Sequence, residues 1–188
     1  LQNMLMGDYN YLYTKTDSEE WMTFDLGTVQ NQQTRDIILN TSNTDQLIYC
    51  YTYKIGGKSY TSAEAFLSDL PSTQLSESDY NYHINRYNVI QALRMMLNFN
   101  RVNDNISAMA KFNELVTDLE SQSSVNDKTL GLIKNLKGDA TNSGQIALAV
   151  SNMQYFKKWG EFYIDQLSRS LNQQIKPNFK DEGCLFGG

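Results

Sequence analysis

The fold of this chain is decided by residues 79–97, which read DYNYHINRYNVIQALRMML. Apolar side chains recur there every three or four residues, which is the spacing of one face of an α-helix. One apolar stripe of this helix consists of Ile84, Tyr87, Ile90 and Leu97. The apolar face is widened by Val89, Leu93 and Met96. Asp79 is a suitable N-cap for this helix. An apolar face this broad predicts a helix that lies buried.

Two helical patterns follow it. The apolar residues of the first lie between 106 and 119, and Asn103 or Asn105 is the expected start. The second is shorter and covers 130–136. Gly138 follows it, and glycine is favoured just beyond a helix C-terminus. These patterns predict two helices of unequal length.

The last helical pattern starts after Asn142 or Ser143 and stays in phase until Pro177. At 1.5 Å per residue, its roughly 33 residues would span about 50 Å, which exceeds the diameter of a small domain. Gly160 is the expected position of a bend. The chain after residue 79 is therefore predicted to contain four main helices.

Before residue 62 the side chains alternate between polar and apolar, as they do in strands. The expected strands are 9–15, 21–29, 34–40, 46–55 and 58–61. Gly56 and Gly57 predict a hairpin turn between the last two. Cys50 shares a strand face with Ile48, so we expect a buried, inert thiol. The predicted fold class is α+β, with an antiparallel β meander or partial sandwich followed by a mostly four-helix α-helical domain.

The domain organisation follows from this change of pattern. Residues 1–61 are the β-rich segment, and 62–78, with Pro71 and many Ser, Thr and Glu residues, are a linker. Residues 79–188 are the helical domain with an ordered C-terminal tail. A β-rich segment of about 60 residues is marginal as an independent fold. We therefore expect its strands to complete their sheet against the helical half or against chain upstream of Leu1.

The composition excludes several classes of function. The longest apolar runs fall short of the ~20 residues of a membrane span, so no membrane insertion is expected. A net charge of -5 argues against a dedicated nucleic-acid binder. One histidine and two distant cysteines cannot close a zinc site. We expect neither a metal nor a cofactor.

The sequence does not place potential catalytic side chains in a recognisable catalytic motif. A Cys–His nucleophilic pair would use His83, but its place at a helix entrance favours an ordinary surface or hydrogen-bonded histidine. Asp25, Arg35 and Asp36 lie on neighbouring expected strands, where a cross-strand ion pair is the expected arrangement. The sequence therefore favours a protein that is not an enzyme.

Two short stretches in the β-rich segment resemble a known family. They are residues 24–29 (FDLGTV) and 33–39 (QTRDIIL). They are similar to the β-rich segment that follows the von Willebrand factor A domain in a family of eukaryotic multidomain proteins. The motif residues of this part are Asp25, Gly27 and Arg35.

The C-terminal half is similar to the helical domain called Vwaint, which is described for von Willebrand factor A proteins that also carry intein-like Hint regions. The resemblance rests on residues 139–149, on 155–160 (YFKKWG) and on 178–181 (NFKD). Its motif residues are Trp159, Gly160, Asn178, Phe179, Lys180 and Asp181. Phe162 and Glu182 depart from the family pattern, which has His and Pro there.

The resemblance implies a non-enzymatic structural and protein-interaction region of a larger von Willebrand factor A protein. Its partner would be its own upstream A domain or another protein chain. An alternative is a substrate-recruiting accessory region of a ubiquitin ligase, because some similar proteins join the A domain to a U-box or RING. A Cys/His hydrolase is a third and less favoured interpretation.

The densest aromatic cluster of the chain surrounds Trp159. Trp159 and Tyr163 lie about one helical turn apart, so we expect them to anchor the helical core. Exposed members of the cluster would form an aromatic hot spot for a partner protein. The candidate interaction residues are Lys157, Lys158, Trp159, Tyr163, Arg169 and Phe179.

Overall fold

The structure is a computed structural model of the chain. It describes residues 26, 28–29, 36–37, 48–69, 76–123, 125–138 and 144–174. These residues divide into two compact units. Residues 48–69 belong to the first, here called the β unit, and the remaining described residues belong to the second, the helical unit.

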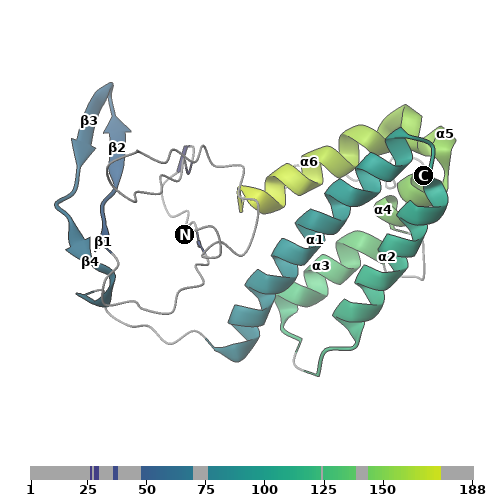
Figure 1. The fold of residues 1–188 in the computed structure, drawn as a ribbon, viewed down its shortest axis with the longest axis horizontal. Coiled ribbons are helices and arrows are strands. Elements are labelled where there is room, and N and C mark those ends of the chain that lie inside the picture. Colours follow the sequence, from purple (N-terminus) through teal and green to yellow (C-terminus); the bar gives the residue numbers. More distant parts are fainter. Residues whose placement is uncertain are drawn as a thin grey trace, which may run out of the picture. The chain divides into compact units, whose positions relative to one another are not determined.

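The β unit contains two short antiparallel strand pairs, one nested within the other along the chain (Figure 1). Strand β1 (Ile48–Tyr49) pairs with β4 (Ala65–Phe66), and β2 (Thr52–Ile55) pairs with β3 (Lys58–Thr61). A 3₁₀ turn, η1 (Leu67–Asp69), follows β4.

The hairpin turn predicted at the two glycines is confirmed. Gly56 and Gly57 have φ angles of 57° and 81°. Two successive left-handed residues form the tight turn whose twist matches that of the flanking strands, and glycine adopts this conformation without strain. The short strand predicted at 58–61 is confirmed as β3.

Two other expectations for the β unit were wrong. The single strand predicted over 46–55 is broken between β1 and β2, because the hydroxyl of Ser62 accepts the N–H of Tyr51 at 3.0 Å in place of a ladder carbonyl. Cys50 is exposed and not buried. A two-stranded sheet has no layer against which to bury a thiol.

The strands expected at 9–15, 21–29 and 34–40 lie almost wholly outside the described residues. Those that the structure describes are Leu26, Thr28, Val29, Asp36 and Ile37, and none of these five is in a strand. The meander or partial sandwich therefore stays a prediction.

The helical unit is built on α1 (Glu77–Arg101), the helix predicted from residues 79–97. The hydroxyl of Ser76 accepts the N–H of Asp79 at 3.1 Å and donates to its carboxylate at 2.8 Å. Ser76 is therefore the N-cap, and Asp79 is the third helical residue, in a reciprocal arrangement like a capping box. The buried apolar residues of α1 are Val89, Ile90, Ala92, Leu93, Met96 and Leu97.

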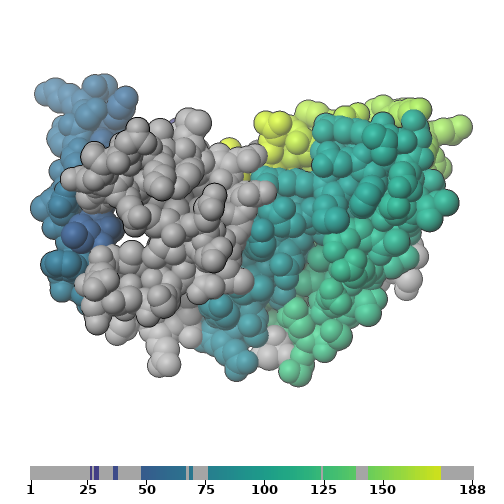
Figure 2. Space-filling view, viewed as in Figure 1, coloured from purple at the N-terminus to yellow at the C-terminus, as the bar shows by residue number. Residues whose placement is uncertain are grey.

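Helix α2 (Asn105–Glu120) packs against α1, and α3 (Asp127–Lys137) packs against both. Figure 2 shows the side chains of α1 and α2 in close contact on the face that is drawn. Helix α3 ends at Gly138 as predicted, with a φ of 76°. No described helix has the length and apolar character needed to cross a bilayer.

The start of α2 differs from the prediction. Its N-cap is Asp104, whose carboxylate accepts the N–H of Ser107 at 3.0 Å. Asn103 instead takes a left-handed φ of 61° just after α1. Ile106, where the apolar pattern of this helix begins, is 81% exposed, whereas Ala108 in the same turn is buried.

The last predicted helix is not one continuous rod. Helix α4 (Gln145–Ser151) stops at Asn152, whose backbone is extended and whose side chain caps α5 (Met153–Tyr155). A π-turn, η2 (Phe156–Gly160), then leads into α6 (Glu161–Asn172). The main break therefore lies at Asn152 and not at Gly160.

Asn100 and Gly160 contact α4 and so stabilise the arrangement of the segments on either side of Asn152. The buried amide of Asn100 on α1 donates to the carbonyl of Val150 at 3.3 Å, near the C-terminus of α4, where helical carbonyls lack intrahelical partners. At Gly160, an added Cβ would lie 2.6 Å from the Cβ of Ala149. Gly160 therefore allows η2 to pack directly against α4.

One apolar core joins all the main helices of the helical unit. Its largest fully buried side chains include Phe112, Leu93, Met96, Leu119, Leu136, Ile146, Ile164 and Leu167. The predicted α+β class is confirmed, with short antiparallel strands preceding a predominantly helical part.

Candidate functional site

The predicted aromatic cluster lies on α5, η2 and the first turn of α6. The ring of Trp159 is 6.2 Å from that of Tyr155 and 6.0 Å from that of Tyr163, measured between centroids. The contact with Tyr163 is edge-to-face, the favoured geometry for aromatic pairs. Trp159 and Tyr163 are half-buried against the apolar core, so their expected role as anchors of the helical core is confirmed.

Other members of the cluster are exposed. Phe162 is 65% exposed and Tyr155 is 43% exposed. Lys157 and Lys158, on η2, are also exposed. The exposed members are therefore aromatic and basic, and the interaction hot spot stays a prediction.

Arg169, another predicted interaction residue, pairs with a neighbour on its own helix. Arg169 forms an ion pair with Asp165 at 2.9 Å, one turn earlier on α6. At 1.5 Å per residue it lies about 15 Å along the chain's helical path from Trp159. The other motif residues lie outside the described part of the chain: Asp25, Gly27, Arg35, Asn178, Phe179, Lys180 and Asp181.

The β unit carries a second aromatic group, here called the tyrosine ladder and formed by Tyr51, Tyr53 and Tyr60. Tyr53 and Tyr60 face each other across β2 and β3, with ring centroids 5.2 Å apart and planes 15° apart. Tyr51 stacks on Tyr53 at 6.2 Å. Tyr51 and Tyr53 are both exposed.

The hairpin therefore has two chemically different faces. Ile55 and Lys58 pair beside the tyrosine ladder, and Ile55 is 65% exposed. On the opposite face, the hydroxyls of Thr52 and Thr61 hydrogen-bond each other at 3.0 Å. One face thus carries the tyrosines and Ile55 together with Lys58, and the other is polar.

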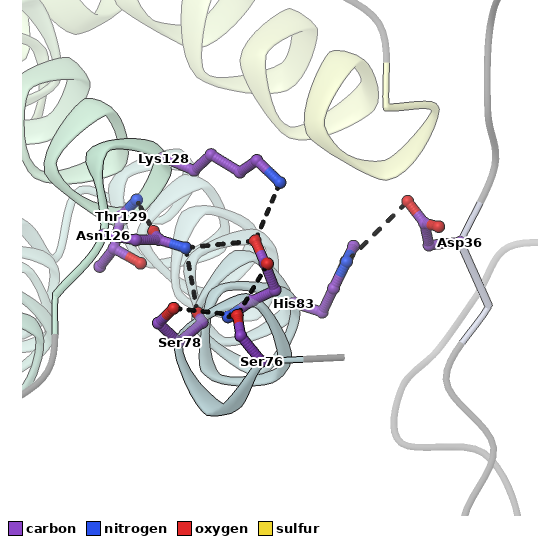
Figure 3. Close-up of polar contacts among 8 residues, drawn as sticks. Asp36, Ser76, Ser78, His83, Asn126, Lys128 and Thr129 are labelled. Carbon is purple, nitrogen blue, oxygen red and sulfur yellow. Dashed lines mark hydrogen bonds and ion pairs between the residues drawn. The ribbon is translucent and has the colours of Figure 1, made fainter. Parts of the chain in front are cut away.

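A polar cluster at the start of α1 was not recognised in the sequence. Figure 3 shows Ser76, Ser78, Asn126, Lys128 and Thr129 gathered there, where the N-termini of α1 and α3 meet. Their contacts bring together capping groups from two helices that start about 50 residues apart. Only the tertiary packing juxtaposes them.

Asp79 receives most of these contacts. Its carboxylate lies 3.0 Å from the ammonium of Lys128 and 3.5 Å from the amide nitrogen of Asn126. The hydrogen bond from Ser76, followed by that from Lys128, lowers the pKa of Asp79 below its usual value. Asn126 also accepts the N–H of Thr129 at 2.9 Å and so caps α3.

His83 lies two turns into α1 and is only 7% exposed, so the expectation of a surface residue was wrong. Its Nε2 is 3.9 Å from a carboxylate oxygen of Asp36 (Figure 3). Its Nδ1 is buried without a hydrogen-bond partner in the described structure. Burial, followed by the charge of Arg86, lowers the pKa of His83, and the charge of Asp36 opposes this shift.

The expected cross-strand ion pair among Asp25, Arg35 and Asp36 stays a prediction. The carboxylate of Asp36 faces His83, and its backbone is hydrogen-bonded to Gln174, which follows α6. Asp25 and Arg35 lie outside the described residues. Among the residues that the structure describes, no three His, Cys, Asp or Glu side chains are placed to hold a metal ion.

The C-terminal part of the chain matches a known family model. Residues 109–188 match the family model Vwaint, described as VWA / Hh protein intein-like. This range includes most of α2 and all of α3 to α6, so the resemblance seen in residues 139–181 is confirmed. The similarity of residues 24–39 to a β-rich segment stays a prediction. Neither the curated proteins nor the solved structures gave a match.

Proposed function

We propose that this chain, whose residues 109–188 are of the Vwaint type, is a non-enzymatic structural and protein-interaction region of a larger von Willebrand factor A protein. The observation that carries the proposal is the exposed tyrosine ladder of the β unit. Every residue of β2 and β3 is exposed, including Tyr53 and Tyr60.

An exposed ladder of this kind favours association. A hairpin of two strands is marginally stable on its own, so contact with another surface would stabilise it. Tyrosine offers a large, amphipathic contact area and loses little conformational entropy when it is held in place. Burying Tyr53, Tyr60 and Ile55 against a partner would therefore supply binding energy at a low entropic cost.

The strand edges suggest how the partner binds. Within the described residues, β2 and β3 pair only with each other, so each has an outer edge. An added strand would form main-chain hydrogen bonds along such an edge, while the ladder would contact its side chains. The partner we propose is the upstream A domain of the same protein, or another chain that donates a strand.

The test is amide hydrogen exchange on the chain with and without the separately expressed A domain of its parent protein. We expect added protection along residues 52–61. The double variant Tyr53→Ser/Tyr60→Ser should weaken binding at least tenfold, which corresponds to about 1.4 kcal/mol.

The matched control is Thr52→Ala/Thr61→Ala, which alters the cross-strand pair on the polar face. It should leave the affinity within about twofold, well below the tenfold step that 1.4 kcal/mol represents. Equal losses in both double variants, or protection confined to the helical unit, would contradict the proposal.

A further inference from the structure

We infer that Gln174 and His83 form an internal docking site of the helical unit, and that Asp36 occupies it. We call this arrangement the Asp36 clamp. It joins residues that are 138 positions apart in the chain. The inference is independent of the proposed function, because it concerns only contacts within the helical unit.

Gln174 recognises the backbone of Asp36. The N–H of Asp36 donates to its Oε1 at 2.9 Å, and its Nε2 donates to the carbonyl of Asp36 at 2.7 Å. A residue in a hydrogen-bonded antiparallel pair exchanges the same two bonds with a neighbouring strand. The amide of Gln174 therefore makes the two hydrogen bonds that a neighbouring strand would make, and it holds position 36 through its backbone.

The end of α6 positions Gln174 for this contact. Gln174 has a φ of 52°, and its N–H donates to the carbonyl of Leu171 at 3.3 Å. A left-handed residue just beyond a helix is a common way to close the C-terminus. Glutamine is an uncommon choice there, since glycine or asparagine adopts this conformation more readily. Its side chain supplies the two bonds that glycine lacks.

The surroundings of His83 select an acidic side chain. The positive groups acting on His83 are Arg86 of α1 and Lys128 of α3, and the negative groups are Asp79 and Asp36 itself. His83 presents Nε2 to the Asp36 carboxylate at 3.9 Å from a buried position. A carboxylate complements this environment, whereas a lysine in its place would be repelled.

The clamp fixes one end of the segment that leaves the helical unit and returns to it. Residues 38–75 belong to the other compact unit, and both Asp36 before them and Ser76 after them belong to the helical unit. Ser76 is fixed as the N-cap of α1, seven positions before His83. The clamp therefore closes a long loop whose other end α1 already fixes, and opening it would restore loop entropy.

The test compares Gln174→Gly with Gln173→Ala in the whole 188-residue chain. Glycine suits the positive φ of position 174, so it removes the side chain without straining the helix end. We expect the amide proton of Asp36 to exchange at least tenfold faster in Gln174→Gly. Gln173, an exposed neighbour of the same type, should have no effect when replaced.

Two further measurements keep the inference falsifiable if Gln174→Gly folds poorly. Gln174→Asn tolerates the same backbone, but its shorter amide cannot reach both groups, so it should also accelerate exchange at Asp36. Asp36→Asn should lower the pKa of His83 measured by NMR, because it removes the carboxylate that favours the protonated ring. Unchanged exchange at Asp36 in both Gln174 variants would overturn the inference, as would an unchanged His83 pKa.

Discussion

At the scale of single residues, His83 shows how burial changes the pKa of a side chain. Its imidazole is enclosed beside Arg86, and both conditions disfavour the protonated ring. Asp36 offsets this effect only in part. The folded chain therefore favours the neutral imidazole, whose Nδ1 is buried without a hydrogen-bond partner in the described structure.

Stability should fall on mild acidification because of this residue. The pKa of His83 is lowered in the folded chain, so the unfolded chain takes up the proton first as pH falls below about 6.5. The free energy of unfolding is therefore fully maintained above that pH and decreases from there towards the folded pKa. Urea unfolding at closely spaced pH values between 7.5 and 5.5 measures this slope.

His83→Gln provides the comparison. The chain has one histidine, so the variant removes the only imidazole that titrates in this window. Its free energy of unfolding should vary less with pH than that of the wild type. Identical slopes in the two proteins would show that the lowered pKa of His83 has no thermodynamic effect.

At the scale of elements, two glycines in helical segments have opposite roles. Gly131 lies on the exposed face of α3, and an added Cβ would meet nothing within 4 Å. Gly160 lies at the contact between η2 and α4, where an added Cβ would be 2.6 Å from that of Ala149. The same substitution should therefore have opposite effects at the two positions.

Gly131→Ala should stabilise the chain by about 0.5–1 kcal/mol, because alanine loses less backbone entropy in a helix and fits the open space. Chemical denaturation monitored by circular dichroism measures the change. A lower midpoint than the wild type would mean that the exposed face of α3 has a packing requirement not seen in these contacts.

Gly160→Ala should destabilise the chain by about 1–3 kcal/mol, as overpacking in a close contact does. The double variant Gly160→Ala/Ala149→Gly tests the cause, since it removes the opposing Cβ. Recovery of part of the lost stability is expected. If the double variant is no more stable than the sum of the single changes predicts, contact with Ala149 is not the reason for glycine at this position.

At the scale of the whole molecule, the chain consists of two compact units with different degrees of burial. The core of the helical unit is continuous across its main helices, whereas every residue of β2 and β3 is exposed. Opening free energies within one protein follow the density of buried contacts. The amide protons of the two units should therefore exchange with solvent through openings that have different free energies.

Phe112→Ala tests this separation. Phe112 is fully buried in the helical core, so its truncation should cost about 3–5 kcal/mol. Native-state hydrogen exchange should then show reduced protection at α1 residues such as Leu93 and Met96. Protection at Tyr53 and Tyr60 should stay unchanged, and an equal loss in both units would show that they open together.

Local patterns in the sequence were sufficient for several features. The apolar spacing in residues 79–97 predicted α1, Gly138 predicted the end of α3, and the pair at Gly56 predicted the hairpin. Each depends on neighbours within one or two turns, because periodicity and backbone preference act over that distance. The similarity to Vwaint was likewise carried by short motifs within residues 139–181.

Other features were decided only by tertiary structure. The break at Asn152 lies within an uninterrupted helical pattern, and the amide of Asn100 that supports it comes from another helix. The burial of His83 and the contact of Asp36 with Gln174 depend on segments up to 138 positions apart. Spacing along the chain reports which face of an element is apolar. It does not report which distant polar group will contact the carbonyl of Val150 or the ring of His83, because that depends on how the helices pack.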